Sequence, residues 1–436
     1  MKYFRTPFEI VKIMKKHLPI AQMRILEPAV GEGALLETLN PLRVGRNVTA
    51  IDIDPARLKA LKYTYKKINL INEDFLEWSE RCTYKYDLII TNPPFSAKSK
   101  DWISYENKKI PIELLFFIKS IKLLDSGGTL IGIVPDAIIN SSSFSEERMD
   151  IMLNNKITYV YQLPKRVFKS IESGFFLIVV KKGGVTNKVT LRRVCDNGCE
   201  EIFVDRHEVA KNNFRLDFSF YSSARFYNGG LSIHEKLPLQ KLSDFCEIKR
   251  GGVRNCYQTH GLIHTWSFKN GVWGEDFTFL NDRENYCVMV KRVSRNAHLT
   301  FGVAKNKDIV NTTDCVIIIS SSEVDPFKLL FFLRVFYSNS HGEDYMLKGT
   351  GAKFISVSFL NDIKYLDIST IYRNDFENYC NALLERDFLT CKEIESHVFI
   401  RFFSQDKVFS IFDESYMKNS DVCHEVENLK NTSLII

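Results

Sequence analysis

The chain has 436 residues, more than one ordinary domain of about 100–200 residues, so the length predicts two domains. Hydrophobic residues (45%) and charged residues (26%) occur at globular levels, which excludes a disordered or fibrous protein. The net charge of +6 permits a polyanionic partner without requiring one.

The N-terminal segment MKYFRTPFEIVKIMKKHLPI lacks the apolar core of about 7–15 residues that a signal peptide needs. No apolar stretch reaches the ~20 residues of a membrane helix. The longest, Glu113–Leu124 and Phe327–Tyr337, are interrupted by Lys119 and Arg334, and we expect buried helices there. The sequence therefore predicts a cytoplasmic protein without a membrane partner.

The ten cysteines are scattered, and only Cys195 and Cys199 lie close together, without a second pair of metal ligands. We therefore expect reduced thiols, with neither a disulfide framework nor a zinc site. His260 and His264 are four residues apart but lack the Glu of a zinc-protease motif, so we expect structural roles for them. No metal is predicted.

Short β-type runs alternate with amphipathic stretches over roughly the first 185 residues. Expected strands are Arg24–Leu26, Val48–Ile51, Asn69–Ile71, Asp87–Thr91, Thr129–Val134, Thr158–Tyr161 and Phe175–Val180. Expected helices are Glu9–Leu18, Gly33–Leu39, Pro55–Tyr65 and Ile112–Leu124. Such alternation predicts an α/β fold with a mostly parallel, doubly wound sheet that binds ligands at the carboxyl ends of its strands. The pattern ends near Gly183–Gly184.

The rhythm changes from Pro238 onward, where short apolar runs give way to the helical stretches Pro326–Tyr337 and Tyr372–Phe388. This predicts a separate α+β module, with Arg215–Pro238 as the transition. The expected domains are residues 1–237 and 238–436.

Acidic residues follow three successive strands of the first half. The first strand leads into Glu27-Pro28-Ala29-Val30-Gly31, where glycine lets the backbone approach a ligand closely. Asp52-Ile53 ends the second strand, near the offset of about 20 residues at which a carboxylate meets ribose hydroxyls. Asp74-Phe75 follows the third, offering an acceptor for an adenine amino group and an apolar wall. Together they predict a nucleotide-like cofactor site.

The fourth strand runs directly into Asn92-Pro93-Pro94-Phe95. The prolines fix the backbone and remove two donors, so the Pro93 carbonyl is left as an acceptor beside the Asn92 amide oxygen. Two such acceptors can hold both hydrogens of an exocyclic amine while Phe95 stacks on its ring. The motif predicts a site for an aromatic amine.

These ordered motifs resemble those of the S-adenosylmethionine-dependent, gamma-class adenine-N6 DNA methyltransferases. Thr6-Pro7 before the first helix, Ile118–Pro135 with its double glycine, and Val167-Phe168 followed by Gly174–Ile178 resemble further motifs of that family. The resemblance covers roughly residues 3–183. It implies a class I Rossmann-like catalytic domain with S-adenosylmethionine as cofactor.

The resemblance also implies roles for single residues. Cofactor-binding residues would be Thr6, Glu27, Pro28, Ala29, Gly31, Asp52, Ile53, Asp74, Phe75, Asn92 and Phe116. The catalytic motif would be Asn92, Pro93, Pro94 and Phe95, with Phe168 stacking on the second face of the target adenine. Many relatives carry Tyr where this chain has Phe95, and stacking needs only the ring. Because N6 is out of reach inside a duplex, the base must be flipped out.

Two segments of the second half, Leu237–Gly252 and Leu347–Ile363, resemble the ends of target-recognition modules in type I specificity subunits and gamma-class methyltransferases. Basic residues lie in or between them beside glycines, a composition suited to DNA phosphates. The expected DNA-binding residues are Lys249, Arg250, Arg254, Lys291, Arg292, Arg295, Lys348 and Lys353. Double-stranded DNA is the expected partner.

Two other functions stay open at this point. Asn-Pro-Pro-aromatic motifs also serve methylation of amino or amide nitrogens in RNA or in protein glutamine, and a non-catalytic DNA-binding relative is the third option. No cysteine follows a proline, so the nucleophile of cytosine-C5 methylation is absent. No nuclease motif is visible, so any restriction endonuclease is expected to be a separate partner.

The net charge divides unevenly between the expected domains. Residues 1–237 carry 36 basic and 27 acidic side chains, and residues 238–436 carry 23 and 26. Within the second half, residues 238–361 have a net charge of +3 and residues 362–436 of −6. We therefore expect the acidic C-terminal segment to face away from DNA.

Overall fold

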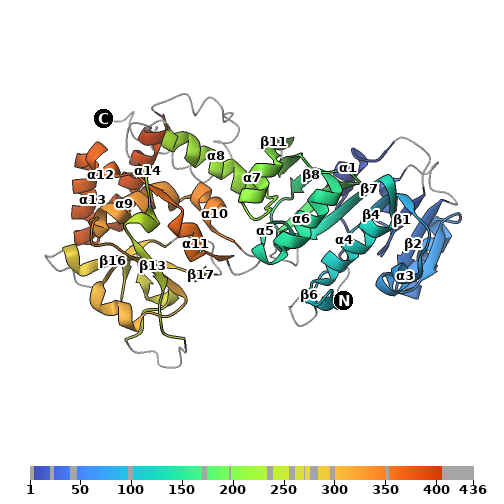
Figure 1. The fold of residues 1–436 in the computed structure, drawn as a ribbon, viewed down its shortest axis with the longest axis horizontal. Coiled ribbons are helices and arrows are strands. Elements are labelled where there is room, and N and C mark those ends of the chain that lie inside the picture. The colour runs from blue at the N-terminus through green and yellow to red at the C-terminus, as the bar shows by residue number, and fades with distance from the viewer. Residues whose placement is uncertain are drawn as a thin grey trace. The chain divides into compact units, whose positions relative to one another are not determined.

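The protein is described by a computed structural model that covers residues 4–19, 24–39, 47–96, 102–168, 174–195, 198–232, 239–254, 261–269, 271–274, 283–294, 300–348 and 353–404. The chain divides into two compact units, which meet in the sequence between Phe218 and Ser219 (Figure 1). This break lies inside the predicted transition segment Arg215–Pro238.

The first unit is built on a nine-stranded sheet with the order β11-β10-β8-β9-β7-β4-β1-β2-β3. The strands are β1 (Ile25–Glu27), β2 (Val48–Asp52), β3 (Asn69–Asn72), β4 (Tyr86–Thr91), β7 (Leu124–Pro135), β8 (Asn155–Gln162), β9 (Phe175–Lys182), β10 (Lys188–Cys195) and β11 (Gly198–Asp205). β3, β2, β1, β4 and β7 form a continuous parallel series. β9 is antiparallel to both of its neighbours, and β11 is antiparallel to β10. The mostly parallel α/β fold is confirmed.

The predicted end of the pattern near Gly183–Gly184 is wrong, because β10 and β11 extend the sheet beyond it. The β10–β11 hairpin pairs Lys188 with Asp205 through to Cys195 with Gly198. Its outermost strand alternates exposed and half-buried side chains along most of its length. A sheet-edge hairpin needs little apolar content, so it lacks the hydrophobic run that marks an interior parallel strand.

The helices of the first unit are α1 (Phe8–Lys15), α2 (Pro55–Thr64), α3 (Phe75–Arg81), α4 (Ile112–Leu123), α5 (Asp136–Asn140), α6 (Ser145–Asn154) and α7 (Arg206–Lys211). A short hairpin of β5 (Ile103–Tyr105) and β6 (Lys108–Ile110) precedes α4. α2 and α3 begin where the side chains of Asp54 and Asp74 accept backbone N–H groups of the first turn.

The predicted helix Gly33–Leu39 is wrong, since only the 3-10 turn Leu36–Thr38 forms there. Gly31 and Gly33 both adopt positive φ angles, +55° and +82°, which a right-handed helix excludes. A side chain at Gly33 would meet the Leu61 side chain at 2.7 Å. The segment from Gly31 to Leu39 therefore forms a tight turn after β1 that packs closely against Leu61 of α2.

One hydrophobic core joins α1 to the sheet. The buried face of α1, which includes Ile10, Val11 and Met14, packs in the same cluster as β2, β4, β7 and β9 residues. This packing holds the segment before α1 next to the carboxyl ends of the central strands.

The second unit contains a six-stranded sheet with the order β13-β19-β16-β18-β15-β14. Its strands are β13 (Glu247–Arg250), β14 (Phe268–Lys269), β15 (Val272–Trp273), β16 (Tyr286–Lys291), β18 (Gly302–Lys305) and β19 (Val316–Ser320). Two small pairs accompany it, β12 (Gln240–Lys241) with β21 (Lys364–Tyr365), and β17 (Val293–Ser294) with β20 (Lys353–Phe354). The predicted α+β class of the second half is confirmed.

The helices of the second unit are α8 (Phe218–Ser232), α9 (Pro326–Tyr337), α10 (Ser340–Met346), α11 (Val357–Asn361), α12 (Ile368–Ile371), α13 (Arg373–Glu385) and α14 (Phe388–Ser404). α9 is buried at every position except Lys328, as predicted for this apolar stretch. Among the described residues, no helix has both the length and the apolar character needed to span a membrane.

A buried ion pair ties the helices of the second unit together. Arg334 of α9 donates from Nε to Glu395 Oε1 of α14 at 2.6 Å, and both side chains are 9% exposed. Arg334 Nη1 also donates to the carbonyl of Phe301, just before β18. The pair therefore connects two helices with the sheet.

Candidate active site

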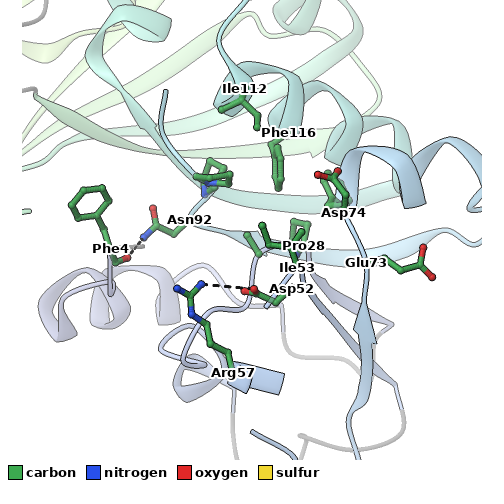
Figure 2. Close-up of a pocket in the computed structure, with 14 residues that line it drawn as sticks. Phe4, Pro28, Asp52, Ile53, Arg57, Glu73, Asp74, Asn92, Ile112 and Phe116 are labelled. Carbon is green, nitrogen blue, oxygen red and sulfur yellow. Dashed lines mark hydrogen bonds and ion pairs between the residues drawn. The ribbon is translucent and has the colours of Figure 1, made fainter. Parts of the chain in front are cut away.

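A pocket lies at the carboxyl ends of β1, β2, β3 and β4, where a doubly wound sheet binds its ligands. The empty space within and at the mouth of this pocket, which includes open solvent, amounts to about 730 Å³. Figure 2 shows the side chains that surround it. The lining residues are Phe4, Pro28, Ala29, Asp52, Ile53, Arg57, Glu73, Asp74, Phe75, Asn92, Pro93, Pro94, Ile112 and Phe116.

Asp52 holds the turn after β1 against the end of β2. Its Oδ2 accepts the N–H of Gly31 at 2.7 Å, and its Oδ1 accepts the N–H of Asp54 at 2.9 Å. Arg57 approaches the same carboxylate at 3.8 Å from the first turn of α2 (Figure 2). Since a carboxylate has about four acceptor positions, Asp52 still has capacity to accept hydroxyl groups from the pocket.

Glu27 is the last residue of β1 and directly precedes the lining residue Pro28. It is 1% exposed, and its Oε2 has no hydrogen-bond partner among the described residues. Burial, and secondarily the charge of Asp52, raises the pKa of the Glu27 carboxyl well above its ordinary value. A buried acceptor of this kind is suited to a ligand group or a bound water.

The far wall of the pocket combines one acid with two aromatic rings. Asp74 caps α3 through Oδ1, which accepts the N–H of Leu76 at 2.7 Å. Phe75, the next residue, packs its ring 4.9 Å from that of Phe116 on α4. This wall therefore offers a carboxylate acceptor beside apolar rings, the surroundings that a flat group with an amino donor needs.

Asn92 is held in one orientation by the segment before α1. Its Nδ2 donates to the carbonyl of Phe4 at 3.0 Å, as Figure 2 shows, and to Oγ1 of Thr6, also at 3.0 Å. Its Oδ1 is buried and has no hydrogen-bond partner among the described residues. With both amide hydrogens engaged, the Asn92 amide presents an acceptor oxygen to a ligand and cannot turn over without losing these bonds.

Phe95 and Phe168 form an aromatic cluster with Phe4 and Phe175. The ring centroids of Phe95 and Phe168 are 6.0 Å apart with an interplanar angle of 56°. Phe168 is 4% exposed and packs 4.7 Å from Phe175. A base stacked between two parallel rings needs about 7 Å between them, twice a carbon contact distance. In this conformation the two rings contact the cluster and leave no slot between them.

The predicted site residues divide into lining and supporting groups. Lining the pocket are Pro28, Ala29, Asp52, Ile53, Asp74, Phe75, Asn92, Pro93, Pro94 and Phe116. Outside its lining are Thr6, Glu27, Gly31, Phe95 and Phe168. Of these, Thr6 contacts Asn92, Gly31 contacts Asp52, and Glu27 is buried. The roles of all of them remain predictions.

Four lining residues were not identified from the sequence: Phe4, Arg57, Glu73 and Ile112. Glu73 stands beside the predicted Asp74, and Ile112 is one turn before the predicted Phe116, so helical spacing could have indicated it. Phe4 binds Asn92 through its backbone carbonyl, for which a sequence gives no side-chain signal.

The predicted DNA-binding residues converge at one end of the second unit's sheet. Arg250 of β13 pairs with Ile317 of β19. Val316, the residue before Ile317, pairs with Lys291 of β16. Beyond β16, Ser294 pairs with Lys353, and Lys348 bridges to Phe354. We call the set Lys249, Arg250, Arg254, Lys291, Arg292, Lys348 and Lys353 the basic edge. Arg295 and His260 lie outside the described residues.

The residues of the basic edge differ in their surroundings. Arg250 and Arg254 are exposed, whereas Lys249 is paired with Glu247 at 2.9 Å. Arg292 donates to the carbonyl of Asp314, and burial lowers the pKa of Lys291. Of the basic edge, the two exposed arginines are thus the residues most open to solvent-borne anions.

His264 and the cysteines of the described ranges are not arranged to hold a metal. His264 Nδ1 lies 2.7 Å from Thr313 Oγ1, a structural contact. Cys195 and Cys199 lie at the end of the β10–β11 hairpin as free thiols. In the described part of the chain, no group of three or more His, Cys, Asp or Glu residues is arranged to hold a metal ion.

Residues 36–168 match the family model described as Eco57I restriction-modification methylase. The chain is 30% identical over 181 residues to the modification methylase CviBIII of Paramecium bursaria Chlorella virus NC1A, covering 39% of this chain and 46% of the relative. It is 23% identical over 456 residues to the type II methyltransferase M.HincII of Haemophilus influenzae, covering 98% of this chain and 80% of that relative.

The chain thus spans less than half the length of CviBIII and of another curated relative, M.VspI of Vibrio sp. (strain 343). Among solved structures, the type IIG restriction endonuclease BpuSI matches 89% of this chain and 60% of that protein, with 13% identity and a TM-score of 0.47.

The family match assigns S-adenosylmethionine as the cofactor, and the pocket residues fit it. Asp52, Glu73 and Asp74 outnumber the lone lining cation Arg57, which suits a positively charged sulfonium. Asp52 would hold the ribose, Asp74 the adenine amino group, and Phe75 and Phe116 the adenine face. The buried Asn92 Oδ1 stands at the same pocket, where a methyl acceptor could meet it.

Proposed function

We propose that this chain is a site-specific DNA methyltransferase acting on the N6 amino group of adenine, because residues 36–168 match the family model described as Eco57I restriction-modification methylase. The observation that carries the proposal is Asn92, whose amide hydrogens are fixed while its buried Oδ1 is left to accept. An exocyclic amine is a donor that fits this acceptor.

The reaction needs a more nucleophilic amine than free adenine provides, because the N6 lone pair is delocalised into the ring. Asn92 Oδ1 and the Pro93 carbonyl would accept the two amine hydrogens and favour a tetrahedral nitrogen with an exposed lone pair. S-adenosylmethionine supplies the activated methyl group when bound. The chain's own contribution is positioning and hydrogen bonding, and neither needs a metal.

The target base has to leave the duplex to reach Asn92. Phe95 would stack on one face of the flipped adenine and Phe168 on the other. Because the two rings contact the same aromatic cluster, entry of the base would require Phe168 or Phe4 to move aside. The proposal therefore includes a rearrangement of this aromatic cluster when the base enters.

DNA binding would belong to the second half of the chain. The assignment of residues 1–237 to catalysis and 238–436 to target recognition rests on the pocket in the first unit and the basic edge in the second. Double-stranded DNA is the proposed partner, with a separate restriction endonuclease as a second one.

The test is product identification. The purified full chain is incubated with isotopically labelled S-adenosylmethionine and, separately, duplex DNA, RNA and protein extract, and the labelled nucleosides or amino acids are identified by mass spectrometry. N6-methyladenine in DNA is the expected product. Label confined to RNA or to protein glutamine would replace the proposal with the corresponding amino-nitrogen methylation, and N4-methylcytosine would overturn the base assignment.

A further inference from the structure

The Asn92–Phe95 motif is held at both of its ends. At the N-terminal end, Asn92 is bound by Phe4 and Thr6. At the C-terminal end, the residue that follows Phe95 is Ser96, which has two contacts with a single carboxylate on α4.

That carboxylate belongs to Glu113. Its Oε2 accepts the backbone N–H of Ser96 at 3.0 Å and the Ser96 hydroxyl at 2.9 Å. Glu113 is 4% exposed, although it stands in the first turn of α4, next to the pocket-lining Ile112. Figure 2 shows Ile112 and Phe116 of this helix above the pocket.

A buried carboxylate at this position needs an explanation. An acid in a helix's first turn stabilises the helix equally well when exposed, where no desolvation cost arises. Here burial raises the pKa of Glu113, and the hydrogen bonds from Ser96 oppose that rise. The two donors of Ser96 thus offset part of the cost of burying this carboxylate.

The Ser96–Glu113 contact joins the Asn92–Phe95 motif to α4. Ser96 leaves the catalytic motif, and Glu113 sits on the helix whose Ile112 and Phe116 line the cofactor pocket. Pro93 and Pro94 restrict the backbone between Asn92 and Phe95, so fixing Ser96 fixes the last free end of that segment. The Pro93 carbonyl and the Phe95 ring then keep their places relative to α4.

We propose that Glu113 is a positioning residue, which through Ser96 holds the Asn92–Phe95 motif in register with the cofactor-covering helix α4. This inference rests on the proposed function for its catalytic consequence, whereas the hold on the motif itself is independent of the reaction. Glu113 contacts neither the methyl acceptor nor the cofactor in this role.

The experiment compares the wild-type chain with Glu113→Ala, Glu113→Gln and Ser96→Ala. Ser120→Ala is the matched control, because Ser120 is buried on the same helix and its Oγ has no partner among the described residues. Hydrogen–deuterium exchange of the peptide that contains residues 92–96 reports the hold on the motif. Single-turnover methyl transfer to whichever substrate the wild-type chain methylates reports its catalytic consequence, and calorimetry gives the Kd of S-adenosylmethionine.

Glu113→Ala is expected to speed exchange in residues 92–96 and to slow methyl transfer by about 10–100-fold, the scale of a small misplacement of reacting groups. The cofactor Kd should change less than about threefold. Glu113→Gln keeps an acceptor oxygen and should recover most of both losses, and Ser96→Ala, which keeps its N–H, should lie between wild type and Glu113→Ala.

Unchanged exchange in Glu113→Ala, or faster exchange with an unchanged transfer rate, would overturn the proposal. If Ser120→Ala speeds exchange in residues 92–96 and slows methyl transfer as much as Glu113→Ala does, the effect comes from general packing of α4. That result would also overturn the proposal. If Glu113→Ala fails to fold, Ser96→Ala is compared with Ser120→Ala by exchange of residues 92–96 and by methyl transfer. Faster exchange and slower transfer in Ser96→Ala alone would support the proposal, and equal results for the two variants would overturn it. Absence of DNA methylation by the wild-type chain would instead reject the proposed function, while the exchange result would still judge the hold on the motif.

Discussion

The pocket of the first unit and the basic edge of the second are built in different ways. In the pocket, backbone groups fix the functional side chains: Gly31 N–H holds Asp52, and the Phe4 carbonyl holds Asn92. At the basic edge, strand pairing brings charged residues together, but the exposed Arg250 and Arg254 extend into solvent. A fixed site suits chemistry on one small group, whereas an adaptable cationic surface suits a polyanion whose geometry varies.

The largest expected effect is on the second unit's own stability. Replacing Glu395 by Ala leaves Arg334 buried without its partner, and we expect a loss of about 3–5 kcal/mol in the free energy of unfolding. Glu393→Ala, an exposed change on the same helix, is the control and should cost under about 0.5 kcal/mol. Denaturant unfolding measures both, and equal midpoints would contradict the buried-pair account.

The next largest effect is expected on cofactor binding when Asp74 is replaced, and Asp54 separates this effect from the loss of a helix cap. Asp74 and Asp54 both cap helices, but only Asp74 lines the pocket. Replacement of either by Ala should cost about 1 kcal/mol of stability, and only Asp74→Ala should also weaken S-adenosylmethionine binding, by about tenfold. Calorimetric titration distinguishes them, and equal cofactor affinities for the two variants would exclude a contact from Asp74.

A smaller effect is expected at the basic edge. Arg250→Ala should weaken DNA binding and reduce the slope of log K against log salt by about 1, because one phosphate contact is lost. Lys392→Ala is the control, since Lys392 is exposed on α14 within the acidic C-terminal segment. A reduced slope in Lys392→Ala would contradict the expectation that this segment faces away from DNA.

The smallest effect is expected on the pH dependence of stability, through His17, which lies two residues after the end of α1. His17 Nε2 lies 2.7 Å from Tyr161 Oη, and Arg192 donates to the same Oη. Burial, then the charge of Arg192, lowers the pKa of His17 from 6.5 to about 4.

The unfolded chain therefore binds a proton at His17 between pH 6.5 and 4 that the folded chain does not, so stability falls as the pH drops through this window. His17→Gln should flatten that fall, measured as Tm against pH. An identical pH profile for both proteins would show that His17 does not titrate differently on folding.

Much of the first unit could be predicted from the sequence, because its strands are apolar runs that end in recognisable residues. The carboxyl ends of parallel strands meet at one sheet edge, so Asp52, Asp74 and Asn92 were expected together and all line one pocket. Glu27 and Gly31 were expected beside them. Glu27 is buried next to the lining residue Pro28, and the N–H of Gly31 donates to Asp52.

What could not be predicted depends on long-range or backbone contacts. The hold of Phe4 on Asn92 spans 88 residues and uses a carbonyl, and the hold of Glu113 on Ser96 uses a backbone N–H. α3 was missed because it has seven residues with one buried side chain, too few to show helical periodicity. The converging strand ends of the basic edge depend on pairings that no local pattern shows.

The central claim, that Asn92 presents an acceptor to an adenine amine, is tested most directly by replacing it with Ala and measuring two quantities. The account predicts that Asn92→Ala lowers the single-turnover rate of N6-methyladenine formation in duplex DNA by about 10²–10³-fold, the effect of losing one such oxygen or donor at a reacting centre, while the Kd of S-adenosylmethionine changes less than about threefold. Methyl transfer at the wild-type rate, or loss of cofactor binding in parallel with activity, would contradict it.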